Sequence, residues 1–214
     1  MMRRLAAAIV IAMLAALQLG VAPSPPRIVA QWNSTEDPGR KFEKILVIGI
    51  SEDREIRHRF EDKVVTHLRG RNIGAVTSYS LVPDLLAPGS REEILSRIEA
   101  QKIDAAISFR VVPLGKRDEA AWDAEWKKEV EGAGSLRDLI QSTLPLKATK
   151  SKLYGVEVAL WSNQTPVRFW AGRTGVYKLD ELREGTTDLI QDVLDTLQYV
   201  HRIPNPAAGR VSTP

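Results

Sequence analysis

The sequence of 214 residues contains no cysteine, and this absence limits how the protein is attached and stabilised. Because no cysteine follows the apolar amino-terminal run, the chain is not a diacylated lipoprotein. An exported domain without disulfides must depend on its hydrophobic core. About 180 residues are ample for one such core.

The sequence also lacks the motifs of common enzyme chemistry. It contains no G-x-S-x-G motif and no GxxxxGK[ST] phosphate loop. Its histidines, His58, His67 and His201, are scattered, and no HExxH pair is present. The lone Gly49 after the first predicted strand fits strand packing better than phosphate binding. The sequence therefore predicts no cofactor, no metal site and a non-enzymatic role.

An excess of charge of one sign is missing from the predicted mature domain. The formal charge is +3, but Arg3, Arg4 and Arg27 all lie in an amino-terminal segment that has no acidic residue. Removing these three from the 30 basic residues leaves 27 basic and 27 acidic residues. This balance argues against a nucleic-acid partner, which requires a basic surface.

Residues 1–30 have the pattern of a signal peptide. Arg3 and Arg4 form a basic start, and residues 5–22 contain no charge. The residues before position 31 favour cleavage after Ala30. The alternative is an uncleaved membrane anchor, because about 18 apolar residues almost span a hydrocarbon core of ~30 Å. Both alternatives place the remainder outside the cytoplasm, either free in the periplasm or anchored in the inner membrane and facing the periplasm.

Residues 42–201 predict a single α/β domain, which follows a polar lead-in at 31–41. Buried strands and amphipathic helices alternate along the first part, which is typical of a parallel sheet. The predicted order is strand 45–50, helix 53–68, strand 75–81, a helix from residue 90 and strand 104–112.

An excursion at 113–151 interrupts this alternation. Trp122 and Trp126 within it are four residues apart, so we expect them to pack onto the domain from one side of a helix. A hairpin at 156–174 and a closing carboxyl-terminal helix complete a mixed sheet of about five strands. Residues 202–214 read as a disordered tail.

The hairpin carries the most specific pattern in the sequence. If Asn163 and Gln164 form a two-residue turn, Leu160 pairs with Val167 and Val158 with Phe169. One face is then wholly apolar. The opposite face carries the candidate binding residues Glu157, Trp161, Arg168 and Trp170.

Two interpretations of that second face remain open. Either the excursion or the lead-in covers the tryptophans, and the Glu157–Arg168 pair is a weak rim contact. Alternatively, the face is open and binds a partner chain or an envelope polymer, because exposed aromatic residues beside charges are typical anchors. A movable cover would reconcile the two.

A second candidate site lies at the carboxyl ends of the parallel strands, where open α/β sheets usually bind ligands. It would bring together Ser51, Asp84 and Arg110. This crevice supports the alternative function, a small-ligand-binding protein or a hydrolase. The same residue types also occur as ordinary helix caps and turns.

The order of these elements resembles a group of small exported bacterial envelope proteins of unknown function. The similarity rests on residues 42–51, 77–84, 156–161 and 169–174. More distantly, it is similar to the mixed α/β domain of curli-secretion-type and TolB amino-terminal-type proteins. The resemblance implies an interaction or assembly module of the cell envelope whose partner is an envelope protein or polymer.

Overall fold

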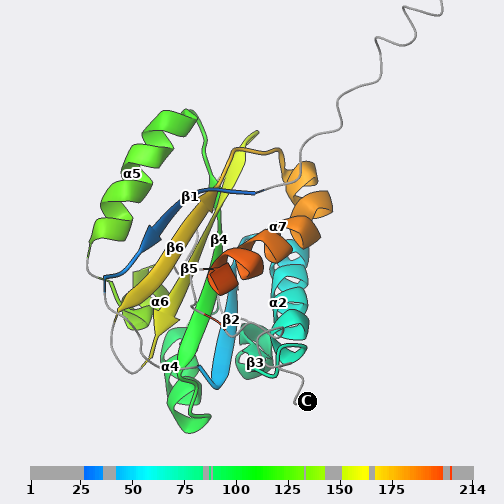
Figure 1. Ribbon diagram of the computed structural model, residues 1–214, viewed down its shortest axis with the longest axis vertical. Coiled ribbons are helices and arrows are strands. Elements are labelled where there is room, and N and C mark those ends of the chain that lie inside the picture. Colours follow the sequence, from blue (N-terminus) through cyan, green and yellow to red (C-terminus); the bar gives the residue numbers. More distant parts are fainter. Residues whose placement is uncertain are drawn as a thin grey trace, which may run out of the picture.

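The chain folds around one six-stranded mixed sheet (Figure 1). The computed structural model describes residues 27–35, 42–83, 87, 89–132, 134–142, 151–163, 167–199 and 203. The strand order is β1-β6-β5-β4-β2-β3. The strands are β1 (Ile28–Asn33), β2 (Lys44–Ile50), β3 (Gly74–Thr77), β4 (Ala105–Pro113), β5 (Tyr154–Ser162) and β6 (Arg168–Thr174). The predicted mixed α/β class is confirmed.

The parallel half of the sheet arises from the predicted alternation of strands and helices. Strand β2 pairs in parallel with β3 on one side and with β4 on the other. The connections are α2 (Arg54–Arg69), α3 (Ser78–Leu81) and α4 (Ser90–Ala100). Helix α2 begins where the Asp53 carboxylate accepts the N–H groups of Glu55 and Ile56 at 3.0 and 3.1 Å.

The antiparallel half contains one strand more than the sequence predicted. Strands β4, β5, β6 and β1 pair antiparallel in succession. Residues 28–33 form β1, so the prediction of an irregular lead-in is wrong for its first three residues. The predicted cleavage after Ala30 would cut through the middle of this strand. Residues 36–41 and the tail after Ile203 lie outside the described residues.

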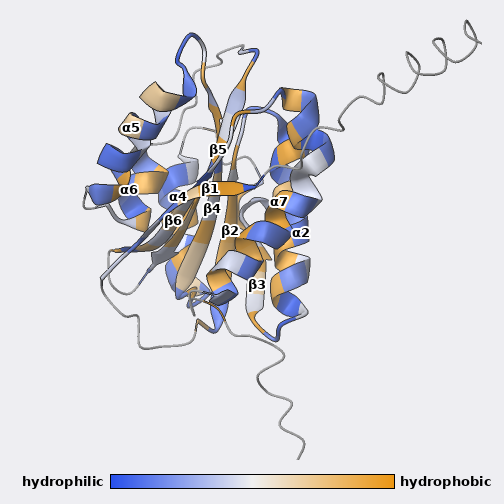
Figure 2. Ribbon diagram, turned by 45° about the horizontal axis from the view of Figure 1, so that its top comes forward, coloured by the Kyte–Doolittle hydropathy of each residue, from blue (hydrophilic) through white to orange (hydrophobic). Residues whose placement is uncertain are grey.

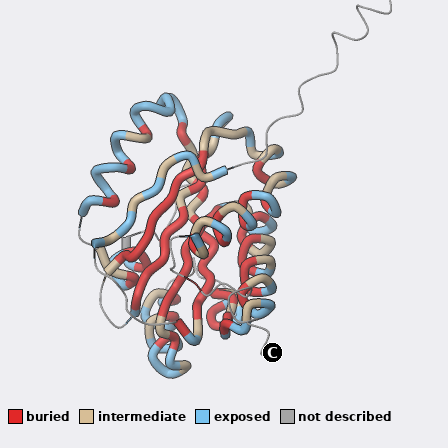
Figure 3. Tube along the Cα trace, viewed as in Figure 1, coloured by how far each residue is buried: buried red, intermediate tan, exposed pale blue. Residues whose placement is uncertain are grey.

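Helices cover both faces of the sheet (Figure 2). Helices α2 and α7 (Leu179–Tyr199) pack on one face. Helices α4, α5 (Glu119–Glu131) and α6 (Leu136–Ser142) lie on the other. The strands β2, β4, β5 and β6 are largely buried, whereas α5 is largely exposed apart from the side that faces the sheet (Figure 3). The excursion is therefore partly helical and packs back onto the domain, as predicted.

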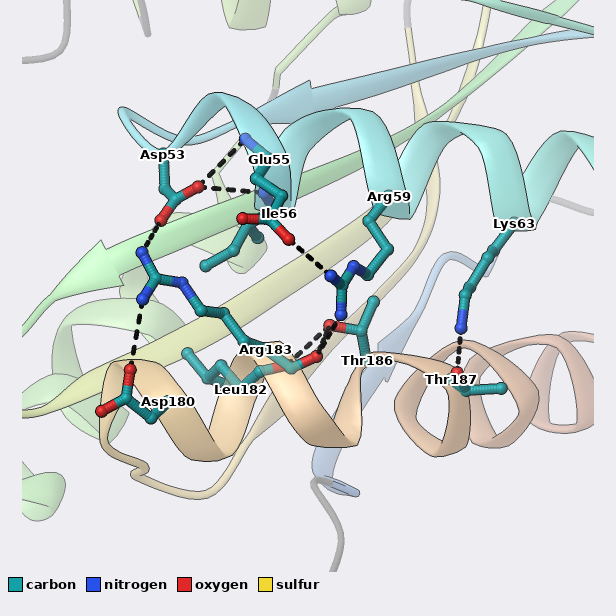
Figure 4. Close-up of polar contacts among 10 residues, drawn as sticks. All are labelled: Asp53, Glu55, Ile56, Arg59, Lys63, Asp180, Leu182, Arg183, Thr186 and Thr187. Carbon is teal, nitrogen blue, oxygen red and sulfur yellow. Dashed lines mark hydrogen bonds and ion pairs between the residues drawn. The ribbon is translucent and has the colours of Figure 1, made fainter.

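Polar contacts join the two helices of the first layer along their rim (Figure 4). Arg183 of α7 forms an ion pair with Asp53 and accepts, through its carbonyl, a hydrogen bond of 3.0 Å from Arg59 of α2. Lys63 donates to Thr187 one turn further along. These contacts lie outside an aliphatic core to which α7 contributes the buried residues Leu182, Leu189, Ile190, Val193, Leu194 and Leu197.

Candidate functional site

Strand β5 sends alternate side chains to opposite faces, as predicted. Val158 and Leu160 lie in the α2/α7 core, and Trp161 lies in the core beneath α5 and α6. The predicted pairing with β6 is wrong by three residues, because Leu160 pairs with Trp170 and not with Val167. Three is an odd number, so the shift turns Trp170 to the face opposite Trp161.

A longer connection and a bulge together explain the shift. Ser162 N–H donates to the Val167 carbonyl at 3.1 Å, so β5 meets β6 two residues further along than a two-residue turn allows. An irregularity between Leu160 and Trp161 adds the third residue and makes the shift odd. Asn163 is tied to the start of β4, because its N–H donates to the Asp104 carbonyl at 2.9 Å. The alternation of apolar residues cannot reveal this tie, which joins segments 59 positions apart.

Both hairpin tryptophans are buried, so the open aromatic face is not formed. Trp161 is 4% exposed and shares its core with Trp126 of α5 and Leu139 of α6. Trp170 is fully buried on the α7 side, where its Nε1 donates to Gln31 Oε1 at 3.4 Å. The excursion thus covers Trp161, while Trp170 belongs to the opposite core.

Glu157 is the centre of a polar network on the α5 face. It lies opposite Arg110 on β4 and opposite Arg173 on β6. Arg110 Nε donates to Glu157 Oε2 at 2.7 Å, and Trp122 Nε1 of α5 donates to Oε1 at 2.8 Å. The predicted Glu157–Arg168 pair is therefore wrong, because Glu157 is paired with Arg110.

Arg110 also connects the sheet to α5. Its Nη2 is 2.7 Å from Glu129 Oε2, in addition to its ion pair with Glu157. Burial by itself would lower the pKa of Arg110, but the carboxylates of Glu157 and Glu129 outweigh burial and raise it. Arg110 is thus a fully compensated cation with an acid on each side.

Arg168 is a buried cation without such compensation. It is 8% exposed, and its guanidinium carbon lies 4.7 Å from the Trp161 ring centroid. Nη1 donates to the Glu129 carbonyl at 3.3 Å, and Nε has no hydrogen-bond partner in the part of the chain that the structure describes. Burial lowers the pKa of Arg168. Trp161 is itself held by a bond of 2.9 Å from Nε1 to Ser108 Oγ.

Arg173 completes what we call the arginine cluster, defined as Arg110, Arg168 and Arg173. Its guanidinium carbon lies 4.9 Å from the Trp122 ring centroid, and its Nε donates to Asp123 Oδ1 at 2.8 Å. Hydrogen bonds from Lys127 and Arg173 lower the pKa of Asp123. Acidic residues of α5 thus pair with two of the three arginines, Arg110 and Arg173, while α5 offers Arg168 only the Glu129 carbonyl.

Helix α5 leaves two hollows beside the cluster. A small cavity beneath the helix is lined by Arg168, Trp161, Arg110 and Glu157. A wider cleft of about 280 Å³ lies between α5 and the end of β4, with Arg110 and Glu157 again in its wall. Arg117 and Glu125, 2.5 Å apart, form its outer rim. Charged side chains of both signs therefore line an accessible cleft.

The other predicted crevice is not formed by Ser51 and Arg110. Arg110 pairs in register with Ile50 and reaches toward α5, whereas Ser51 accepts the Asp53 N–H at 3.1 Å in the loop that starts α2. Asp84 lies outside the described residues. Of the candidate residues, the structure brings together Glu157, Trp161, Arg168 and Arg110.

Sequence reasoning did not select Arg173, Asp123 or Glu129 for the site. The sequence feature that could have pointed to Asp123 and Glu129 was the repetition of acidic residues beside Trp122 and Trp126. Which arginines they would meet depends on the β5–β6 register, so the pairing was not readable from the chain alone. In the described ranges, histidine and acidic residues form no group suited to a metal ion, and no helix is long and apolar enough to cross a membrane.

Comparison with known proteins finds solved structures of distant similarity. No protein-family model and no curated protein matches the sequence. Among solved structures, a point variant of the PelC dodecamer from Paraburkholderia phytofirmans is 16% identical, with 79% of this chain and 97% of that chain covered and a TM-score of 0.42. A second PelC dodecamer structure, also 16% identical, covers 79% and 95% of the two chains with a TM-score of 0.41. Similarity at this level transfers neither assembly nor role to this chain.

Proposed function

We propose that this chain is a non-enzymatic interaction module of the bacterial cell envelope, and that the arginine cluster is its recognition site. The proposed ligand is an acidic segment of a partner protein. The amino-terminal export pattern and the resemblance of residues 42–200 to envelope proteins support the location in the periplasm.

The proposal rests on one observation: the three arginines differ in the groups that α5 presents to them. Helix α5 presents carboxylates to Arg110 and Arg173 but only the Glu129 carbonyl to Arg168. A buried cation without a carboxylate is unfavourable, and an acid from outside would gain the interaction that α5 does not provide. The cavity beside Arg168 has a volume of about 20 Å³, enough for a water molecule, so such an acid would enter there as α5 moves aside.

Helix α5 also indicates the form of the partner. It docks on the arginine cluster with two tryptophans and several acidic side chains, so an acidic amphipathic segment fits this surface. The wider cleft offers that segment a route to Arg110, which also lines the small cavity beside Arg168. A small carboxylate ligand is the second candidate, favoured by the size of the same cleft.

Site-specific photo-crosslinking in cells tests the proposal. A crosslinker at Glu125, which is 58% exposed on the rim, should capture a partner through a peptide rich in aspartate or glutamate. The matched control is Lys63 on the opposite layer. A synthetic copy of the captured peptide should bind at least tenfold more weakly to Arg168→Gln than to the unmodified protein, measured by calorimetry.

Other outcomes count against the proposal. Capture of a segment without acidic residues, or equal binding by the Arg168→Gln variant, would contradict it. If only small carboxylates bind and no peptide is captured at Glu125, the small-ligand alternative is correct. Circular dichroism of each variant separates lost binding from lost folding.

A further inference from the structure

Strand β1 is an open edge of the sheet. It pairs with β6 on one side, and no other described segment forms backbone hydrogen bonds with it. Its side chains alternate between half-buried and exposed, unlike the buried strands beside it (Figure 3). The strand Ile-Val-Ala-Gln-Trp-Asn contains no charge and no proline, the two usual guards against edge pairing.

The strand does contain a β-bulge, which also discourages edge pairing, and this bulge limits the part of the edge that another strand can join. The register shifts between Ile28 and Ala30, which marks a bulge at the amino-terminal end of the strand. From Ala30 to Asn33 the pairing with β6 is regular. The edge that another strand can join is therefore this regular stretch.

The hydrogen-bond phase identifies the groups that point outward. Ser34 N–H donates to the Phe169 carbonyl of β6 at 3.0 Å. Antiparallel strands alternate their backbone groups between the two sides, so Trp32 also bonds to β6, while Gln31 and Asn33 direct their N–H and C=O groups away from it. The free edge is thus formed by Gln31 and Asn33.

We propose that β1 pairs antiparallel with β1 of a second copy, around a two-fold axis at Trp32. Residues opposite each other in an antiparallel pair point to the same face, so their numbers must have the same parity. A pair centred on Trp32 places Gln31 of one copy opposite Asn33 of the other and bonds all four outward backbone groups. A pair centred on Gln31 would instead require the bulged Val29.

Charge favours a second copy as the occupant. An edge with charged residues would place like charges opposite one another in an isologous pair, whereas β1 has none. The amide side chains of Gln31 and Asn33 offer donors and acceptors to each other across the two-fold axis. The two Trp32 side chains lie opposite one another, an arrangement that favours aromatic contact.

The absence of cysteine makes the register directly testable by disulfide formation. A mixture of the single variants Gln31→Cys and Asn33→Cys, made in the full chain, should form a cross-linked heterodimer on oxidation. Each variant alone should cross-link at least tenfold more slowly, because like positions are not opposite. Trp32→Cys should cross-link by itself, and Val29→Cys, which is 54% exposed, is the surface control.

A proline variant provides a second measurement. Asn33→Pro removes an outward N–H and none of the described bonds to β6, so it should leave the fold intact and change the mass in light scattering from dimer to monomer. Three results would overturn the proposal: a monomeric unmodified chain, a mass unaffected by Asn33→Pro, or cross-linking of Val29→Cys as fast as Trp32→Cys. Loss of peptide binding at Arg168 leaves these results unchanged, so the two proposals are separable.

Discussion

The two faces of the sheet are covered by helices that use different physical means. On the α2/α7 face, Leu189 and Val193 are fully buried among other aliphatic residues, and the Asp53–Arg183 ion pair remains at the rim. On the α5 face, Arg168 and Arg173 are buried beneath the helix together with two tryptophans. The first face is mainly aliphatic, with Glu61 as a buried acid that accepts hydrogen bonds from Gly49 and Ser78, whereas the second is built around arginines.

The difference separates stability from recognition. Aliphatic burial stabilises the fold without geometric demands, at roughly 25 cal/mol per Å². Buried ions lose their hydration, so their attraction brings little net stability, but removing one partner leaves an uncompensated charge. The charge pairs of the α5 face therefore contribute little to the free energy of unfolding, but they make the surface selective.

Glu157→Ala should have the largest effect. The change leaves Arg110 with only the exposed Glu129 and removes the acceptor of Trp122 Nε1, so we expect a loss of about 3–5 kcal/mol in the free energy of unfolding, measured in urea. Glu129→Ala is the matched control and should cost less than ~1 kcal/mol, because Glu129 is 50% exposed. Equal effects of the two changes would contradict the network.

Shortening the chain at its amino terminus should have an intermediate effect. A chain that begins at Gln31 loses Ile28, which packs on the α7 core and donates its N–H to Asp192 at 2.7 Å. We expect it to be less stable than a chain that begins at Arg27 by about 1–3 kcal/mol. Equal denaturation midpoints would show that the first half of β1 adds nothing.

Arg168→Met should leave stability almost unchanged while it abolishes partner binding. Methionine keeps an apolar contact with Trp161 and removes a buried charge that pairs with no carboxylate among the described residues, so the free energy of unfolding should change by less than ~1 kcal/mol. The loss of stability should be compared with that of Glu157→Ala, because both residues lie beneath α5. A loss as large as that of Glu157→Ala would mean that Arg168 is compensated.

Asp123→Asn should have the smallest effect, and it should depend on pH. The pKa of Asp123 is lowered by Lys127 and Arg173, so its contribution is present at neutral pH and is lost as pH falls through the acid range, below ~4. The variant should be less stable than the parent by under ~1 kcal/mol at neutral pH and equal to it near pH 2.

Glu61, on the opposite side of the sheet, should show the opposite dependence of stability on pH. Burial raises its pKa despite hydrogen bonds from Gly49 and Ser78, so its contribution is largest at acidic pH and falls as pH rises through the raised pKa. Glu61→Gln should therefore become relatively more favourable toward neutral pH. Urea titrations of both variants across the acid range measure the two opposite slopes.

Much of the fold was predictable because it rests on local periodicity. The run 45–50, the spacing within α2 and the alternation in β5 all report which side of an element meets the core. The prediction failed at β1, because a short uncharged segment before a polar loop has the same composition as a lead-in. Only its pairing with β6 distinguishes the two.

The site was half predictable for a related reason. Glu157, Trp161 and Arg168 were placed on one face by alternation within the hairpin, whereas Arg110 was assigned to the separate crevice at the strand ends. Trp170 was assigned to the wrong face, because its direction depends on a bulge between Leu160 and Trp161 that alternation within β5 does not reveal. A shift by an odd number of residues reverses every side chain of a strand.

The sequence by itself determined the class of the fold, the apolar faces of its helices and strands, and the absence of thiol chemistry. These follow from composition and short-range periodicity, which neighbouring residues settle among themselves. Only the tertiary structure decided that α5 covers Arg168 without an acid, that Arg110 is paired on both sides, and that β1 ends the sheet. Each of these depends on long-range pairing, where the loop geometry and the meeting of distant charges select one register among several that the local pattern allows.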